Sequence, residues 1–296
     1  MDRSPSLDQL RALIAVAETG SFSQAARRLD RAQSVVSYAI ANLEAQLGLP
    51  VFERGKRRPV LTPTGHAVLA DARRLDLLMG QLMAKTAGLK AGIEAELSVA
   101  VDVMFPLNRF TDALAALAQV FPTVSLNLTV EALGGVLQLV SDGHCVLGIS
   151  GPIANWPDAI ESEAIGTIEL VTVAAPDHPL ARATEPIDIS NAREHTQLVL
   201  TDRSKLTDGQ SFGVYGTRVW KMADLGAKHR LLLSGLGWGS MPRHLVEQDL
   251  RDGRLIIVRL SDRQTVNYSV SLIRRVDRPS GPAASWLREY LRRAHD

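Results

Sequence analysis

The sequence predicts an α/β protein that combines a small, mainly helical N-terminal part with a larger C-terminal part. Residues 7–48 carry apolar side chains at helical spacing in three short segments. From residue 96 onward, buried strand-like runs alternate with helical patterns. A length of 296 residues suits two or more domains, and a hydrophobic fraction of 46% supplies side chains for their cores.

The N-terminal segments predict a helix-turn-helix followed by a small hairpin. Gly20 suits the left-handed residue that ends the first helix, and Ser21 with Gln24 forms a capping box for the second. Only residues 30–32 separate the second helix from the third, and so short a connection forces a sharp crossing. Residues 51–62 then predict two short strands around a basic tip.

A long fourth helix follows, because Thr62 before Pro63 is typical of a helix start. It carries an apolar seam, defined here as Val68, Ala72, Leu75, Met79, Leu82 and Leu89, which recurs every seven residues with two members offset by four. Nothing in a small N-terminal unit could cover this seam, so a partner helix is its simplest cover. The periodicity is lost near residue 90, where we expect the helix to end.

The C-terminal part predicts two lobes with a cleft between them. About 200 residues of strand and helix alternation exceed what one small sheet needs, and the alternation favours parallel strands with helices on both faces. We expect strands at 97–101, 124–130 (half-buried), 145–149, 168–174, 197–201, 255–260 and 268–273, and helices at 107–120, 133–142, 223–235, 243–250 and 283–294.

Charge is distributed unevenly along the chain. Residues 1–92 contain 13 Lys and Arg against 8 Asp and Glu, whereas the remainder contains 20 against 24. A basic N-terminal part favours contact with an anionic polymer such as DNA. The third helix should turn Gln33, Ser34, Ser37 and Tyr38 outward, which suits a major groove but also fits an ordinary solvated helix face. The neighbouring cluster of Arg54, Lys56, Arg57 and Arg58 favours DNA, because such clusters neutralise phosphates.

Catalytic, metal and membrane functions find little support. The single cysteine, Cys145, allows no internal disulfide, and the seven histidines lack metal-ligand spacing. Residues 148–152 resemble a nucleophile elbow but end in proline, and residues 235–240 lack the last glycine of a dinucleotide motif. No apolar run reaches the length of a membrane span, and the N-terminus lacks the apolar core of a signal peptide. We therefore expect a cytoplasmic protein that is not an enzyme and needs no cofactor or metal.

Several blocks of fixed spacing resemble the LysR-type transcriptional regulators. The N-terminal blocks are LDQLR at 7–11, AETGSFSQAA at 17–26, LEAQLG at 43–48, VFER at 51–54 and LTPTG at 61–65; the C-terminal ones lie at 121–122, 142–143, 177–181 and 235–237, with Pro242. The resemblance implies a winged helix-turn-helix at 5–62, a dimerising linker helix at 63–92 and an effector-binding domain at 93–296. Its lobes would resemble a type 2 periplasmic binding protein, with lobe one at about 93–166 and 268–296 and lobe two at about 167–267.

The resemblance also implies roles for individual side chains. Gln33, Ser34 and Ser37 would reach bases or phosphates, Arg54 the DNA backbone or minor groove, and Thr62 a phosphate. The full predicted set of DNA contacts is Ser21, Ser23, Gln33, Ser34, Ser37, Tyr38, Arg54, Lys56, Arg57, Arg58 and Thr62, with Tyr38 added because its ring could stack on a sugar or a thymine methyl. The chain departs from the family pattern in having Ala32 for Ser or Thr, Ser34 for Pro and Val146 for Asp.

For the effector, we expect contacts from the turns that follow the strands, because strand ends and helix starts converge on a crevice. The candidates are Asp102, Val103, Met104, Ser150, Thr201, Asp202, Arg203, Trp220, Met222, Asp224 and Met241. Asp102 and Asp224 fit helix caps at least as well. Arg203 could pair with an anionic effector or simply face water.

These observations predict a homodimeric or homotetrameric transcription factor whose binding to an imperfect palindrome in promoter DNA responds to a small-molecule effector between the lobes. The competing hypothesis is an enzyme or small-molecule-binding module with an incidental basic head. A third is an architectural DNA-binding protein that responds to no ligand.

Overall fold

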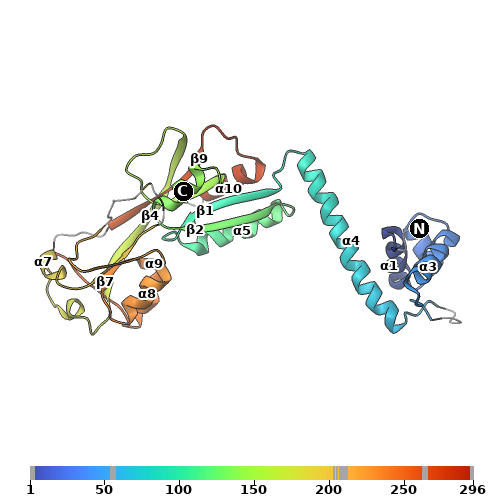
Figure 1. Cartoon of the computed structure of the whole chain (residues 1–296), viewed down its shortest axis with the longest axis horizontal. Coiled ribbons are helices and arrows are strands. Elements are labelled where there is room, and N and C mark those ends of the chain that lie inside the picture. The colour runs from blue at the N-terminus through green and yellow to red at the C-terminus, as the bar shows by residue number, and fades with distance from the viewer. Residues whose placement is uncertain are drawn as a thin grey trace. The chain divides into compact units, whose positions relative to one another are not determined.

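The computed structural model describes residues 4–53, 58–202, 204, 206, 213–261 and 266–293. The chain divides into two compact units, Met1–Lys90 and Ala91–Asp296 (Figure 1). The first unit contains four helices among its described residues: α1 (Leu7–Thr19), α2 (Phe22–Arg28), α3 (Gln33–Leu47) and α4 (Pro63–Lys90).

Local signals set the ends of the short helices. Gly20 (φ 63°) and Gly48 (φ 70°) adopt the left-handed conformation that ends α1 and α3. The Ser21 side chain accepts the Gln24 N–H at the start of α2, as predicted. The reciprocal capping box forms one helix earlier, where Ser6 and Gln9 each satisfy the other's backbone N–H.

The hairpin after α3 is anchored to the helical core. Its two legs meet at a single antiparallel bridge between Phe52 and Leu61. The Glu44 carboxylate accepts the N–H groups of Val51 (2.8 Å) and Phe52 (3.1 Å), and the Phe52 ring packs edge-on against Phe22 at 5.8 Å. These contacts fix the base of the hairpin against α2 and α3. Its tip, residues 54–57, lies outside the described residues.

Helix α4 packs against the rest of the first unit along its N-terminal half. Leu69 and Ala72 are buried there, and Arg11 of α1 pairs with Asp76 at 2.7 Å. Further along, Leu75 and Leu82 of the apolar seam are 50% and 56% exposed. Within the described chain, the distal part of the seam is therefore uncovered.

The second unit is built on one mixed sheet in the order β2-β1-β3-β9-β4-β7-β5-β6, with β8 paired to β4. Strands β1, β2 and β3 are parallel, as are β5, β6 and β7, whereas β4 and β9 run antiparallel to their neighbours. The expectation of parallel strands thus holds only toward the two ends of the sheet. The strands are β1 (Glu96–Asp102), β2 (Ser125–Glu131), β3 (Leu147–Ser150), β4 (Ile160–Ala174), β5 (Gln197–Leu200), β6 (Val219–Met222), β7 (Trp238–Pro242), β8 (Ile256–Ile257) and β9 (Val266–Arg275).

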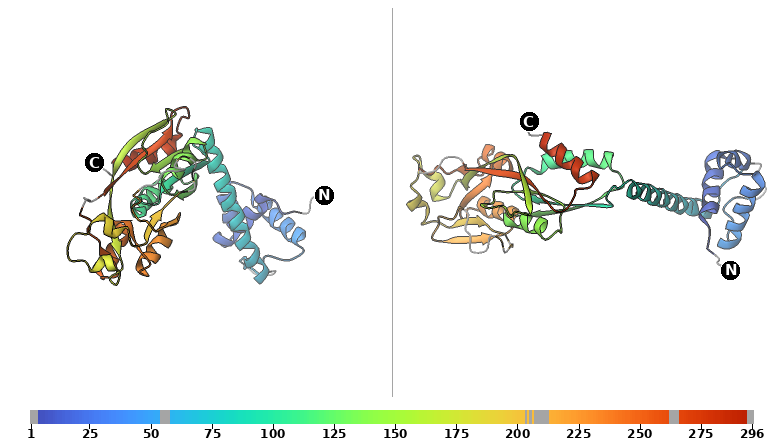
Figure 2. Two further views of the ribbon diagram at one scale, coloured as in Figure 1. Left: turned by 60° about the vertical axis from the view of Figure 1, so that its left-hand side comes forward. Right: turned by 90° about the horizontal axis from the view of Figure 1, so that it is seen from above.

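Helices cover both faces of this sheet. The helices are α5 (Leu107–Val120), α6 (Gly134–Ser141), α7 (Ile189–Ala192), α8 (Leu225–Leu233), α9 (Arg243–Arg251) and α10 (Pro282–Arg293), with a short 3₁₀ turn η1 at Pro179–Arg182. Val99 and Val101 of β1 share a core cluster with α5 and α10, which lie side by side in Figure 2, whereas Ala100 packs with α6. Successive side chains of β1 therefore point to opposite faces of the sheet and pack against a helical layer on each face.

Five strands differ from what the sequence predicts. Strand β4 begins at Ile160, well before the expected 168, and β8 covers only two residues of the expected 255–260. Strand β2 is an edge strand whose Leu126 and Val130 are exposed, so its alternation does not mark a half-buried strand. Strands β6 and β7 were not predicted, because their glycine, lysine and proline content hides the strand pattern.

Two long strands join the lobes. β4 and β9 pair along almost their whole length, and the register shifts between Ala164 and Gly166, where Gly166 has φ 142°. At this bulge Ile165 has no paired residue on β9. Its side chain is nonetheless only 3% exposed and belongs to the main core cluster. The lobes are thus connected by a kinked, well-packed ribbon.

Candidate functional site

The outer face of α3 carries short polar side chains and two exposed apolar ones. Val36 and Ile40 are buried, while Gln33, Ser34 and Ser37 are exposed, as expected from the helical pattern. Tyr38 is 70% exposed. Val35, which the pattern did not single out, is 51% exposed and extends this face. A helix with this surface can offer both hydrogen bonds and apolar contacts to base edges.

The start of α3 has no side-chain cap. Ala32 occupies the cap position and makes no side-chain hydrogen bond. The N–H groups of Val35 and Val36 bond to the Ala32 carbonyl, so in this turn those of Gln33 and Ser34 are open to an anion, which the helix dipole also favours. Close by in sequence, the Ser21 and Ser23 hydroxyls lie 3.0 Å apart at the start of α2, and the side chain of Ser23 is exposed.

The first unit also carries exposed basic side chains in the segments that flank α3. Arg27, Arg31 and Arg58 are exposed, and Arg28 pairs with Glu18 at 2.7 Å. The predicted contacts Arg54, Lys56 and Arg57 lie outside the described residues.

The Thr62 hydroxyl already makes two hydrogen bonds within the protein. It donates to the Pro50 carbonyl at 2.8 Å and accepts the Gly65 N–H at 2.9 Å, which caps α4. A Cβ at Gly65 would overlap the Val51 carbonyl, so only glycine allows this close approach. A phosphate contact by the Thr62 hydroxyl would have to share these bonds.

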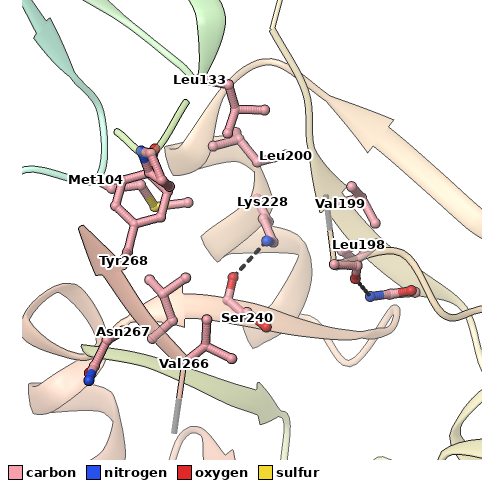
Figure 3. Close-up of a pocket in the computed structure, with 14 residues that line it drawn as sticks. Met104, Leu133, Leu198, Val199, Leu200, Lys228, Ser240, Val266, Asn267 and Tyr268 are labelled. Carbon is pink, nitrogen blue, oxygen red and sulfur yellow. Dashed lines mark hydrogen bonds between the residues drawn. The ribbon is translucent and has the colours of Figure 1, made fainter. Parts of the chain in front are cut away.

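The second unit contains a cavity of about 240 Å³ (Figure 3). Lobe one and the crossing strand β9 contribute one part of its wall, and strands β5 and β7 with helix α8 contribute the other. The lining is mainly aliphatic: Met104, Leu133, Pro152, Leu170, Gln197, Leu198, Val199, Leu200, Gly213, Lys228, Ser240, Val266, Asn267 and Tyr268.

Most of the residues predicted to contact the effector are not among those that line the cavity. Met104 lines the cavity. The rest divide by environment: Asp102, Ser150 and Met241 are buried; Val103, Thr201, Asp202 and Met222 are half-buried; Trp220 and Asp224 are exposed; Arg203 is outside the described residues. Asp224 caps α8 by accepting the Ala227 N–H at 2.7 Å, which is the alternative considered for it from the sequence.

Asp102 is the centre of a buried network beside the cavity. Its carboxylate accepts the Met104 N–H and the Tyr268 hydroxyl, both at 2.8 Å, and backbone N–H groups of Gly151 and Leu133. Burial raises the pKa of Asp102 to about 6, against these hydrogen bonds, which lower it. A Cβ at Gly151 would overlap the Tyr268 hydroxyl. The network therefore holds one wall of the cavity in place. The Asp102 carboxylate bonds to donors of the protein and does not itself line the cavity.

Lys228 is the cationic residue in the cavity lining. Its side chain is on α8, is 4% exposed, and donates from Nζ to the Ser240 carbonyl at 2.6 Å (Figure 3). Burial lowers the pKa of this amino group from 10.5 to about 8. The sequence offered a signal for this residue, because Leu225, Lys228 and Leu232 share the buried stripe of α8. A lysine on such a stripe is unusual enough to mark a functional position.

Two other kinds of site are missing from the described part of the chain. No group of three or more His, Cys, Asp or Glu side chains there is arranged to hold a metal ion. None of the helices found in it combines the length and apolarity needed to cross a bilayer.

Comparisons with known proteins cover nearly the whole chain. Residues 90–296 match the family described as the LysR substrate binding domain, and residues 7–66 match the bacterial regulatory helix-turn-helix protein family of the lysR type. Among curated relatives, a probable HTH-type transcriptional regulator of Escherichia coli K12, YhaJ, is 30% identical, covering 97% of this chain and 96% of its own.

Solved structures agree with this similarity. An OxyR mutant from Corynebacterium glutamicum covers 98% of this chain and 93% of its own with a TM-score of 0.55 at 22% identity, which shows a shared fold. Full-length CbnR, solved in a complex with its target DNA, covers 98% of this chain and 99% of its own with a TM-score of 0.50 at 25% identity.

The burial of Lys228 predicts a pH-dependent stability difference between the wild type and Lys228→Met. Below pH 8 the folded wild type holds a buried charge, so the variant should be more stable by about 3 kcal/mol. Between pH 8 and 10.5 the folded wild type has lost a proton that the unfolded chain keeps, so its stability rises with pH and the difference shrinks.

Urea unfolding followed by tryptophan fluorescence measures this difference, because all four tryptophans lie in the second unit. Lys221→Met, at an exposed lysine of β6, is the control and should show no such trend. A difference between wild type and Lys228→Met that stays constant from pH 7 to 10 would contradict the prediction.

Proposed function

The chain belongs to the LysR family of transcriptional regulators, and on that basis we propose that α2 and α3 bind promoter DNA and that a small-molecule effector in the cavity changes this binding. The observation that carries the DNA-binding proposal is the exposed polar face of an uncapped α3 beside a basic hairpin. The chain is a regulator and not an enzyme, so the hypothesis of a catalytic module with an incidental basic head is not favoured.

We propose that base contacts come from α3 and phosphate contacts from its surroundings. Gln33, Ser34, Ser37 and Tyr38 project from the face that would enter a major groove. The uncapped amides of α3 and the basic side chains around the hairpin would hold phosphates, which sets affinity more than specificity. CbnR, a similar protein, was solved with its target DNA, which supports the proposal that this chain binds DNA. We propose that the protein is cytoplasmic, because a regulator of this kind must reach promoter DNA.

The effector would act by binding one lobe arrangement better than another. Its cavity has walls from both lobes, so occupancy depends on how the lobes close. A ligand can shift promoter binding only by the difference in its affinity for the two states, typically ~1–3 kcal/mol. An architectural DNA-binding protein without an effector would not need such a cavity.

The apolar seam of α4 supports a homodimer. Leu75 and Leu82 are 50% and 56% exposed in the single chain, and the seam repeats at the spacing of a two-helix pair. We propose that residues 63–92 form the dimerising linker between a DNA-binding domain at 5–62 and an effector-binding domain at 93–296. A two-fold dimer presents two recognition helices, so the promoter site should be an imperfect palindrome. A pair of such dimers would form the tetramer.

Duplex binding should weaken steeply with salt. Each neutralised phosphate contributes a slope of about −0.9 in the plot of log affinity against log salt. Arg58→Ala should lower the affinity and reduce this slope by about 1, whereas Arg182→Ala, which alters a surface arginine paired with Asp177 in the second unit, should change neither. Fluorescence anisotropy on a labelled duplex at several salt concentrations measures both quantities. Absence of duplex binding by the wild type in dilute buffer would refute the proposal.

Leu82→Arg should convert the dimer to a monomer, because it places a charge in the seam. Leu77→Arg is the matched control: Leu77 is 64% exposed, but at ~100° per residue it lies on the opposite side of α4. Sedimentation velocity at micromolar concentration distinguishes the two. A wild type that sediments as a monomer, or a Leu82→Arg variant that still sediments as a dimer, would contradict the assignment of the seam.

A further inference from the structure

We propose that the effector of this regulator is a small organic anion, a monocarboxylate with an aliphatic body, whose charged group pairs with Lys228. The inference rests on the proposed function and adds the chemical class of the ligand. Three features carry it: a buried ammonium group in the cavity wall, an aliphatic lining around that group, and acidic side chains near the other end.

The Lys228 amino group has unused hydrogen-bonding capacity. An ammonium group carries three donors, and among the described residues Nζ has one partner, the Ser240 carbonyl at 2.6 Å. Among the described residues, no Asp or Glu oxygen lies within ion-pair distance of it. A buried cation without a counter-ion is unfavourable, and an anion in the cavity would supply both the missing charge and the missing acceptors.

Two other polar side chains of the wall, Gln197 and Tyr268, are already engaged, and a third, Asn267, is exposed. Gln197 donates from Nε2 to the Gly213 carbonyl and accepts the N–H groups of Tyr215 and Gly216. The Tyr268 hydroxyl donates to Asp102. The remaining lining is dominated by leucine and valine side chains, which suit an aliphatic ligand body.

The surrounding charges favour one negative group on the ligand. Asp102 is in direct contact with Tyr268. Burial raises the pKa of the Tyr268 hydroxyl, and the negative charges of Asp102 and then Asp202 raise it further, so both acids lie near this hydroxyl. A second carboxylate placed toward Tyr268 would face these two acids, with like-charge repulsion in a poorly hydrated cavity. Lys228 therefore selects one anionic group, and the other end of the ligand is apolar.

Such a ligand would contact both lobes. Lys228 and Leu198 belong to lobe two, whereas Met104 and Leu133 belong to lobe one, and all four line the same cavity. In Figure 3 the Lys228 amino group lies on the side of Ser240, across the cavity from Met104. An anion held by Lys228 with its body against Met104 and Leu133 would stabilise one closure of the lobes.

The test uses straight-chain carboxylates from butanoate to octanoate, each beside the neutral amide of the same length. Binding to the full-length protein is measured by isothermal titration calorimetry and by the thermal shift of tryptophan fluorescence. Wild type should bind at least one carboxylate tenfold more tightly than its amide. Lys228→Met should lose this preference, Lys228→Arg should retain part of it, and the control Lys221→Met should match the wild type.

The proposal would be overturned by amides that bind as tightly as carboxylates, by a Lys228→Met variant that keeps the preference, or by no stabilisation from any member of the series. Chloride and phosphate are titrated in parallel, and a shift as large with either would show that the site takes inorganic anions instead. Duplex binding of every variant is measured without ligand. A wild type that binds duplex but shows no preference for carboxylates over amides defeats this inference alone, whereas a wild type that prefers carboxylates but binds no duplex defeats the proposed function alone.

Discussion

A buried hydrogen bond from the Tyr268 hydroxyl to the Asp102 carboxylate holds the effector-binding unit together at the point where its lobes meet. Tyr268 belongs to β9, which crosses between the lobes, and Asp102 ends β1 in lobe one. The same carboxylate accepts backbone N–H groups of Met104, Gly151 and Leu133, so the segments after β1, after β3 and before α6 converge on one acid. Because these segments and Tyr268 border the cavity, its shape depends on this network.

The cavity combines this rigid acid network with a cation that the fold does not satisfy. Asp102 is surrounded by donors and remains an internal structural group, whereas Lys228 has one carbonyl partner. Burial opposes the charge of both, raising the pKa of one and lowering that of the other. A fold selected only for stability would replace Lys228 by an apolar residue, which is why a buried cation with no carboxylate partner in the described part of the chain indicates a ligand.

Local signals made much of the fold predictable, and long-range pairing explains what was missed. Gly20, Gly48 and Thr62 end or cap helices where their residue types predict, because these effects act within a few residues. The mixed sheet was not predictable in the same way, since the antiparallel pairing of β4 with β9 joins segments about 100 residues apart. On the DNA side, helical spacing alone placed the exposed face of α3. On the effector side, the position of Met104 after a strand predicted a place near the cavity, and Met104 does line it. Lys228 also lines the cavity but was not predicted; the sequence signal for it is a single charged residue on the apolar stripe of α8.

The claim that the Asp102–Tyr268 bond locks the crossing strand to lobe one is tested most directly by a double-mutant cycle. Unfolding free energies of the wild type, Asp102→Ala, Tyr268→Phe and the double variant are measured by urea titration with tryptophan fluorescence. A buried hydrogen bond to a carboxylate predicts a coupling energy of about 2 kcal/mol between the two positions. Single-variant losses that simply add, within ~0.5 kcal/mol, would contradict the account.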